Sequence, residues 1–296
     1  MGYHPRHRAN EKQYRRTHFL SRLITFLILL VLIGYPFFEP FNIQVDRQTL
    51  TSSDLSSDIG TLQIVYVTDI HMGNFFSQSR ANELISQINA INPDLILLGG
   101  DYATDAESAV NFFKNSTKFH ARYAVCAVVG DADRAGASSN LSELRAAMVS
   151  AGVTPLINDV AQIRIGSSSV WIAGLDDASS GSPSLSTLSA KVNKDDYVIF
   201  MSHTPSVIPD ALKATSADGS TAWFDLGLFG HTHGGQAPYL GSVLGLTTDI
   251  QERYISGWLN ENRIPLLISN GIGTVGLPIR VFHQPQYHVI TVKYGK

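Results

Sequence analysis

Short apolar segments that end in an aspartate or a histidine recur through the sequence from residue 62 onward. The apolar runs cover residues 62–68, 94–100, 123–130, 197–203 and 224–235. Continuous apolar runs are typical of strands buried on both faces in a layered α/β or α+β fold. The ionisable residues at or just after the ends of these runs are Asp69, His71, Asp101, Asp131, His203, His231 and His233. Because such groups gather on the loops beyond the strand ends of a sheet, the pattern predicts that they converge on one site.

The segments between and after these runs extend the alternation of strands and helices. Apolar residues at helical spacing or capping signals predict helices over 77–92, 106–117 and 140–151. A strand followed by a loop is expected within 41–60, a hairpin over 161–175, and further strands at 265–269 and 286–294. No solenoid repeat is present.

The N-terminal region differs from the rest of the chain in charge and hydropathy. Residues 1–22 hold six basic residues and one acidic residue, a net charge of +5, and the remaining 16 basic and 24 acidic residues give −8. The uncharged apolar segment 23–38 follows, and residues 19–21 extend it toward the about 20 residues that cross a bilayer. The basic flank favours a signal anchor over a buried core helix, and residues 39–42 lack the small residues of a cleavage site. We therefore expect a single-pass protein of the cell membrane, with a cytoplasmic N-terminus and an extracytoplasmic domain.

These features divide the chain into four expected parts. They are a basic tail at 1–18, a transmembrane signal anchor at 19–38, a strand and linker at 39–60, and a globular domain at 61–296. The pair Arg15-Arg16 is similar to a twin-arginine export signal, but His18 displaces the apolar pair that should follow. Positive-inside charge explains this pair better. The opposite sidedness stays open, because an enzyme of nucleotide-linked lipid precursors would face the cytoplasm.

Composition narrows the chemistry of the predicted site. The single cysteine, Cys126, excludes a disulfide framework and a cysteine-built zinc site, and it is expected to pack in the core. A net charge of −3 argues against nucleic acid as the main partner. Mixed carboxylate and imidazole donors suit Mn²⁺, Fe, Zn²⁺ or Ni²⁺ better than Ca²⁺. Two such metals about 3.5–4 Å apart, sharing a carboxylate, form a clamp for a phosphoester.

The order of these motifs resembles that of the calcineurin-like metallophosphoesterases, from about residue 61 to residue 292. The segment SNGIGTVGLPIR at 269–280 is similar to their membrane-anchored or exported bacterial branch, which includes UDP-2,3-diacylglucosamine pyrophosphatases and relatives of twin-arginine-exported phosphoesterases. The resemblance implies a four-layer α/β/β/α sandwich with two divalent cations, Mn²⁺ foremost, at one sheet edge. It also implies a first metal bound by Asp69, His71 and His233, a bridging Asp101, and a second metal bound by His203, His231 and Asp131.

The third motif departs from the family pattern Gly-Asn-His-Asp/Glu, because this chain reads Gly130-Asp131-Ala132-Asp133. Asp131 keeps an oxygen ligand and adds negative charge. Ala132 replaces the histidine that helps to stabilise the transition state or to protonate the leaving group, a loss that costs about 10²–10⁴-fold. Phosphodiesters with a good leaving group, such as pyrophosphates, suffer least from this loss. Arg134 is the candidate substitute for charge stabilisation.

We therefore hypothesise a membrane-anchored phosphohydrolase in which a metal-bound hydroxide attacks a phosphodiester or a pyrophosphate, possible substrates including lipid-linked ones. The residues expected to act in catalysis are Asp101, Asp131, His203 and Arg134. The alternative is a catalytically weak or inactive metal-binding scaffold at the membrane, which the loss of histidine at Ala132 would explain.

Residues outside the motifs carry weaker expectations. Asn74 and Tyr102 follow the first two motifs and are expected to line the substrate mouth. The three histidines that lack a motif are expected to be surface or structural residues: His120, His283 and His288.

Overall fold

Two six-stranded mixed sheets form the centre of the fold. The computed structural model describes residues 5–136, 141–237 and 251–295. The first sheet has the strand order β1-β12-β2-β3-β4-β5 and the second the order β10-β11-β9-β8-β7-β6. The strands are β1 (Gln44–Ser52), β2 (Thr61–Val67), β3 (Leu95–Leu98), β4 (Ala124–Ala127), β5 (Thr154–Pro155), β6 (Asp159–Ile165), β7 (Ser168–Gly174), β8 (Val198–Ser202), β9 (Leu226–Phe229), β10 (Gly257–Glu261), β11 (Ile264–Ile268) and β12 (Gln286–Tyr294).

Helices cover the outer faces of the two sheets. The α-helices are α1 (Pro5–Phe38), α2 (Gln78–Ala90), α3 (Ala106–Asn115), α4 (Leu141–Ser150), α5 (Leu185–Ser189) and α6 (Ile208–Ala211). The 3₁₀ turns are η1 (Glu39–Phe41), η2 (Ala132–Arg134), η3 (Pro205–Val207), η4 (His233–Gly235) and η5 (Glu252–Tyr254). Helices α2, α3 and α4 share a core with the first sheet, and α5 and α6 share one with the second. A third core lies between the sheets, so the expected four-layer sandwich is confirmed.

Side chains alternate between these cores because successive residues of a strand point to opposite faces. In β2, Ile64 lies in the core between the sheets, whereas Val65 packs under the helices of the first sheet. In β8, Ile199 faces the core between the sheets and Phe200 the outer core of the second sheet. Both faces of β2 and β8 are therefore largely buried, which explains why these two strands read as unbroken apolar runs.

Most of the elements expected from the sequence are present with small changes of boundary. The hairpin expected over 161–175 consists of the antiparallel strands β6 and β7, and the strand expected within 41–60 is β1, an edge strand parallel to β12. The helix expected over 140–151 is α4, although residue 140 lies outside the described residues. The short edge strands β5 and β10 were not expected.

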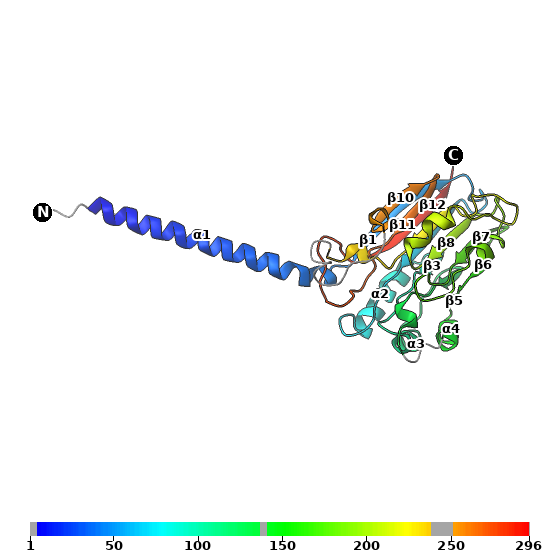
Figure 1. The fold of residues 1–296 in the computed structure, drawn as a ribbon, viewed down its shortest axis with the longest axis horizontal. Coiled ribbons are helices and arrows are strands. Elements are labelled where there is room, and N and C mark those ends of the chain that lie inside the picture. Colours follow the sequence, from blue (N-terminus) through cyan, green and yellow to red (C-terminus); the bar gives the residue numbers. More distant parts are fainter. Residues whose placement is uncertain (1–4, 137–140, 238–250, 296) are drawn as a thin grey trace.

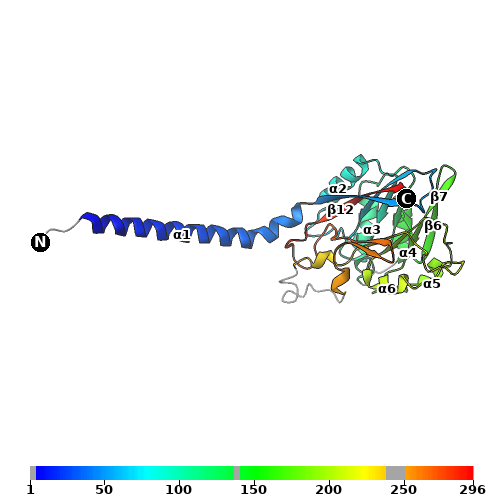
Figure 2. The same ribbon diagram turned by 90° about the horizontal axis from the view of Figure 1, so that it is seen from above.

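Helix α1 projects away from the sandwich in both views (Figures 1 and 2). Together with η1 it contains the span Tyr14–Phe41, of 28 residues, which is long and apolar enough to cross a membrane. The apolar 18-residue window within this span is 0% buried. A buried core helix is therefore excluded. A signal sequence near an N-terminus shares these properties.

Candidate metal centre

The carboxyl ends of strands from both sheets meet at one place, and the backbone there is unusual. Strands β2, β3 and β4 run parallel to one another, as do β7, β8 and β9. Five of the predicted site residues have left-handed backbone angles, with φ between 45° and 69°: Asp69, His71, Asp101, His231 and His233. Such conformations cost energy for residues other than glycine and cluster at functional sites. The loops that follow the strands are thus held in strained conformations that bring their side chains together.

The first group of donors consists of Asp69, His71 and His233, all of them buried. The Nε2 atoms of His71 and His233 lie 3.1 Å apart, and Nε2 of His233 lies 3.6 Å from Oδ1 of Asp69. The hydroxyl of Thr68 donates to the Asp69 carboxylate at 2.9 Å, as does the backbone amide of His231 at 3.1 Å. Asp69 is therefore oriented from two sides.

The second group consists of Asp131, His203 and His231. Oδ1 of Asp131 lies 2.9 Å from Nδ1 of His231 and 3.3 Å from Nε2 of His203. Nδ1 of His203 lies 2.9 Å from the carbonyl oxygen of Gly99. Because a carbonyl only accepts, this contact places the proton on Nδ1 and leaves Nε2 of the neutral ring free to bind a cation.

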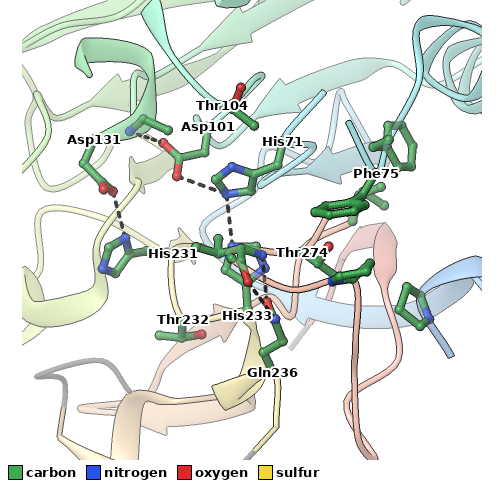
Figure 3. Close-up of a pocket in the computed structure, with 18 of the residues that line it drawn as sticks. His71, Phe75, Asp101, Thr104, Asp131, His231, Thr232, His233, Gln236 and Thr274 are labelled. Carbon is green, nitrogen blue, oxygen red and sulfur yellow. Dashed lines mark hydrogen bonds and ion pairs between the residues drawn. The ribbon is translucent and has the colours of Figure 1, made fainter. Parts of the chain in front are cut away.

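Asp101 lies between the two groups. Its Oδ2 atom is 3.3 Å from Nε2 of His71 and 3.4 Å from Nε2 of His203, while Oδ1 accepts from the amide of Ala132 at 2.9 Å. Figure 3 shows Asp101 between His71 and Asp131. A carboxylate in this position can be shared by two cations.

The electrostatics of the site favour positive charge at its centre. Burial acts to raise the pKa of the Asp101 carboxyl, but His203 and His71 outweigh it and hold that pKa well below its usual range. Burial acts to lower the pKa of His203, but Asp101 and Asp131 outweigh it and raise that pKa well above its ordinary value. Burial, together with His71 and Arg280, lowers the pKa of His233 and keeps its ring neutral, which is the form that binds metals. Seven imidazole and carboxylate donors on adjoining loops thus fit two borderline divalent cations.

Asp133 supports the site from behind and was not singled out in the sequence. Its buried carboxylate accepts from the backbone amides of Gly130, Asp101 and Tyr102 at 2.8–2.9 Å. Burial raises the pKa of this carboxyl to about 7, with Asp101 adding to the effect. A side chain at Gly130 would collide with the Asp101 carboxylate, so the close approach of these two loops requires glycine. These contacts fix the loop after β4 against the loop after β3.

Arg280 is a second supporting residue that the sequence did not single out. Its side chain is fully buried and donates to the carbonyls of Asn270, Gly273 and His283 at 2.6–2.9 Å. Its Nη2 atom also lies 3.2 Å from Nδ1 of His233. The one available signal was an arginine at the end of the glycine-rich segment 269–280, and only the folded chain brings it to the site.

The structure also places the remaining predicted residues. Arg134 pairs with the Asp176 carboxylate, and among the described residues it is not part of the cavity lining and makes no contact that supports its expected role. Asn74 lines the cavity as expected. The expectation for Tyr102 is wrong: its ring is buried, and its hydroxyl donates to the carbonyls of Val128 and Leu98.

The histidines outside the motifs and the cysteine belong to none of the donor groups among the described residues. His120 is exposed, and His283 is half-buried. His288 is buried, with Nδ1 2.9 Å from Asp46 and Nε2 2.9 Å from the hydroxyl of Ser269. Cys126 is buried in the core between the sheets.

A cavity of about 1060 Å³ opens over both donor groups. Its lining includes His71, Asp101, Asp131, His231 and His233, together with Ala132 of the third motif. In Figure 3, the side chain of Phe75 lies on the opposite side of this cavity from Asp131. The donors thus face a space that can hold a substrate.

Comparison with known proteins gives matches over most of the chain. A family model described as "Calcineurin-like phosphoesterase" matches residues 62–235. The "Uncharacterized metallophosphoesterase YkuE" of Bacillus subtilis is 26% identical over 267 residues, covering 88% of this chain and 89% of the relative. The "Uncharacterized metallophosphoesterase Cj0846" of Campylobacter jejuni is 25% identical over 298 residues, covering 96% of this chain and 74% of the relative. The phosphopantetheinyl hydrolase PptH of Mycobacterium tuberculosis superposes with a TM-score of 0.41 at 12% identity, covering 76% of this chain and 98% of that one.

Proposed function

The chain belongs to the calcineurin-like phosphoesterase family and is a metal-dependent phosphoesterase, and from this premise we propose that it hydrolyses a phosphodiester or a pyrophosphate at a dinuclear centre. We assign the first cation to Asp69, His71 and His233, and the second to Asp131, His203 and His231. Asp101 is the shared ligand. The cations, with Mn²⁺ as the first choice, would activate water and neutralise charge on the phosphoryl group.

The observation that carries this proposal is the position of Asp101. Its Oδ2 atom lies within 3.4 Å of one histidine from each group. The chain's own contribution to catalysis is then positional. Strained loops hold the donors, Gly99 and Arg280 orient His203 and His233, and the amide of Ala132 fixes Asp101.

The third motif supports a diester or a pyrophosphate rather than a monoester. Ala132 lines the cavity next to Asp131, at the position where a histidine would reach the leaving group. Without a general acid, the leaving group must depart as an anion, which nitrophenolate or a phosphate can do most easily. Arg134, paired with Asp176, does not fill this place.

We further propose that α1 anchors the enzyme in a membrane, with the basic tail in the cytoplasm and the catalytic domain outside it. The apolar part of α1 is not buried in the protein, and residues 1–22 at its N-terminal side carry a net positive charge. This arrangement holds the site close to a bilayer, which suits a lipid-linked substrate. An alkaline phosphatase fused after residue 296 should be active, and an inactive fusion would contradict the external domain.

Hydrolysis of bis(p-nitrophenyl) phosphate by the full-length protein in detergent tests the proposed chemistry. Water is added to phosphorus, the P–O bond breaks and nitrophenolate leaves. We expect Mn²⁺-dependent turnover that an Asp101→Ala variant loses. Absence of turnover above this variant, in protein that retains two bound metals, would instead favour a metal-binding scaffold, the function that the loss of histidine at Ala132 would explain.

A further inference from the structure

The end of α1 is attached to the rim of the catalytic cavity. Helix α1 runs directly into η1, and residue 40 is a proline, which has no amide proton to donate to the carbonyl of Pro36. The backbone amide of Arg280 donates to this carbonyl instead, at 3.0 Å. The amide of Phe282 donates to the buried Glu39 carboxylate at 3.0 Å, and the ring of Phe282 lies 5.9 Å from that of Tyr35. The apolar helix is thus fixed to the loop that follows β11.

A second loop holds the same helix end from the other side. Arg80, near the start of α2, donates to the carbonyls of Pro40 and Phe75 at 3.1 and 3.0 Å. Its guanidinium lies over two aromatic rings, 4.7 Å from the centre of Phe41 and 4.4 Å from that of Phe76. The loop after β2 therefore carries its aromatic residues to the point where α1 ends.

The cavity has two chemically different ends. The metal donors include Asp131, and Phe75 lies across the cavity from it (Figure 3). The lining also includes Pro40, Phe41, Val275 and Pro278, and Arg80, which contacts Pro40, Phe41 and Phe75. Phe41 is also the last residue of the span that is long and apolar enough to cross a membrane. Phe41 therefore belongs both to the span that could cross a membrane and to the wall of the catalytic cavity.

Exposed apolar side chains surround this second end. Their exposed fractions are 64% for Phe41, 48% for Phe75, 44% for Val275, 43% for Leu277 and 73% for Phe282. We call these five residues the apolar rim. Large apolar groups gathered in this way mark surfaces that contact another apolar phase. Because the rim adjoins α1, the bilayer that contains α1 is the phase within its reach.

Gln236 connects the rim to the metal centre. It is buried, three residues after His233, and its side-chain amide donates to the carbonyls of Val275 and Leu277 at 3.0 and 3.2 Å. Its side-chain carbonyl accepts from the amide of Val275 at 2.9 Å. The rim is thus held in a fixed position relative to the donors.

We propose that the apolar rim rests in the membrane interface and that the substrate is a phosphoester of a membrane lipid, which enters the cavity from the bilayer. Its hydrocarbon part lies along Phe41, Phe75 and Val275 while its phosphate reaches the metal donors. This inference rests on the proposed phosphodiesterase function and names its substrate class.

Contact of the rim with lipid can be measured without any turnover. The full-length protein is reconstituted in phosphatidylcholine vesicles with or without brominated acyl chains, and tryptophan emission is compared between Phe282→Trp, the wild type and Val149→Trp. Val149 is 62% exposed on α4, which lies away from the end of α1 (Figures 1 and 2). Brominated lipid should quench the new tryptophan at position 282 and not that at 149. Equal quenching, or no quenching of either, would overturn the membrane-bound rim.

The substrate class is tested with two diesters that share a leaving group. Hexadecyl p-nitrophenyl phosphate in vesicles is compared with ethyl p-nitrophenyl phosphate, and the readout is the ratio of their kcat/KM values. Phe75→Ser should reduce this ratio by about tenfold, because only the hexadecyl chain can cover the exposed part of this ring. Val149→Ser should leave the ratio unchanged.

The outcomes separate the two proposals. Hydrolysis of the ethyl diester with a ratio near one, insensitive to Phe75→Ser, would overturn the lipid substrate and leave the phosphodiesterase standing. Failure to hydrolyse either diester would contradict the proposed function itself. A high ratio of hexadecyl to ethyl diester hydrolysis that Phe75→Ser lowers supports both the phosphodiesterase and its lipid substrate.

Discussion

The guanidinium of Arg280 lies against the imidazole of His233, with Nη2 3.2 Å from Nδ1. Burial, together with His71 and the positive charge of this guanidinium, lowers the pKa of His233 and disfavours the doubly protonated form of its ring. Burial lowers the pKa of Arg280 to about 10, which still leaves it charged at neutral pH. A buried, permanent cation therefore holds a predicted metal ligand in place and keeps it from being protonated.

Replacing this cation should disturb both folding and metal retention. Arg280→Met leaves several buried carbonyls without a donor, at roughly 1–3 kcal/mol each, so we expect a loss of at least about 3 kcal/mol in the free energy of unfolding. Arg280→Lys keeps the charge but not the planar fork of donors, so it should fold better and still bind Mn²⁺ more weakly. Denaturant unfolding and Mn²⁺ titration measure the two effects.

Arg122→Met is the matched control for this prediction. Arg122 pairs with Asp94 at 3.3 Å, and its side chain is 58% exposed. Surface pairs of this kind contribute about 0–1 kcal/mol. If Arg280→Met lowered the free energy of unfolding no more than Arg122→Met does, the hydrogen bonds of Arg280 would not stabilise the fold.

Restoring a histidine in the third motif should widen the substrate range. Ala132→His places an imidazole in the cavity beside the donors, where it can protonate a poor leaving group. We expect turnover of phosphate monoesters to rise by about 10²-fold, within the range of general acid catalysis. Ala135→His, at another position in the cavity lining, should give no such gain. Equal gains from both variants would contradict a specific role for position 132.

Asp225 should make the fold less stable as the pH rises. Its carboxylate accepts from the amide of Val198 at 2.7 Å. Burial raises the pKa of this carboxyl to about 7, with Asp54 adding to the effect. An unfolded aspartate has a pKa of about 3.9, so the folded state retains a proton that the unfolded state has lost. The stability that this proton provides is present below pH 4 and is lost as the pH rises toward 7.

Asp225→Asn tests this linkage, because asparagine keeps the acceptor for Val198 but does not titrate. At pH 8 the free energy of unfolding of the variant should exceed that of the wild type by about 1–2 kcal/mol, a value that allows for solvent screening. The difference should vanish near pH 4. Thermal unfolding at several pH values, at one Mn²⁺ concentration, provides the comparison. A difference that does not change with pH would contradict the raised pKa.

The layered fold and the convergence of the donors could be predicted because both depend on local sequence. Runs such as residues 94–100 are apolar on both faces, and neighbouring parallel strands such as β2 and β3 bring Asp69 and Asp101 to one edge of their sheet whatever the loops contain. The division of the strands into two sheets came from the resemblance. The edge strands β5 and β10 were missed because they are short and carry few of the apolar residues that mark a buried strand.

The supporting contacts could not be predicted, because they join residues far apart in the chain. Arg280 and Asp133 act through backbone groups of other loops, and backbone groups leave no mark in a sequence. Tyr102 follows a motif directly, yet its ring turns back into the core, where its hydroxyl reaches the carbonyl of Val128. The apolar rim could not be predicted either, because Phe41 and Phe75 come together only where the end of α1 meets the folded domain.

Electron paramagnetic resonance of the full-length protein, stripped of metal and titrated with Mn²⁺, tests most directly whether two cations share Asp101. Two Mn²⁺ ions should bind per chain and give the spectrum of a spin-coupled pair, because a bridging carboxylate would hold them about 3.5–4 Å apart. Asp101→Asn should remove the coupling. Binding of a single ion, or of two ions whose spectra are uncoupled in the wild type, would contradict the dinuclear centre.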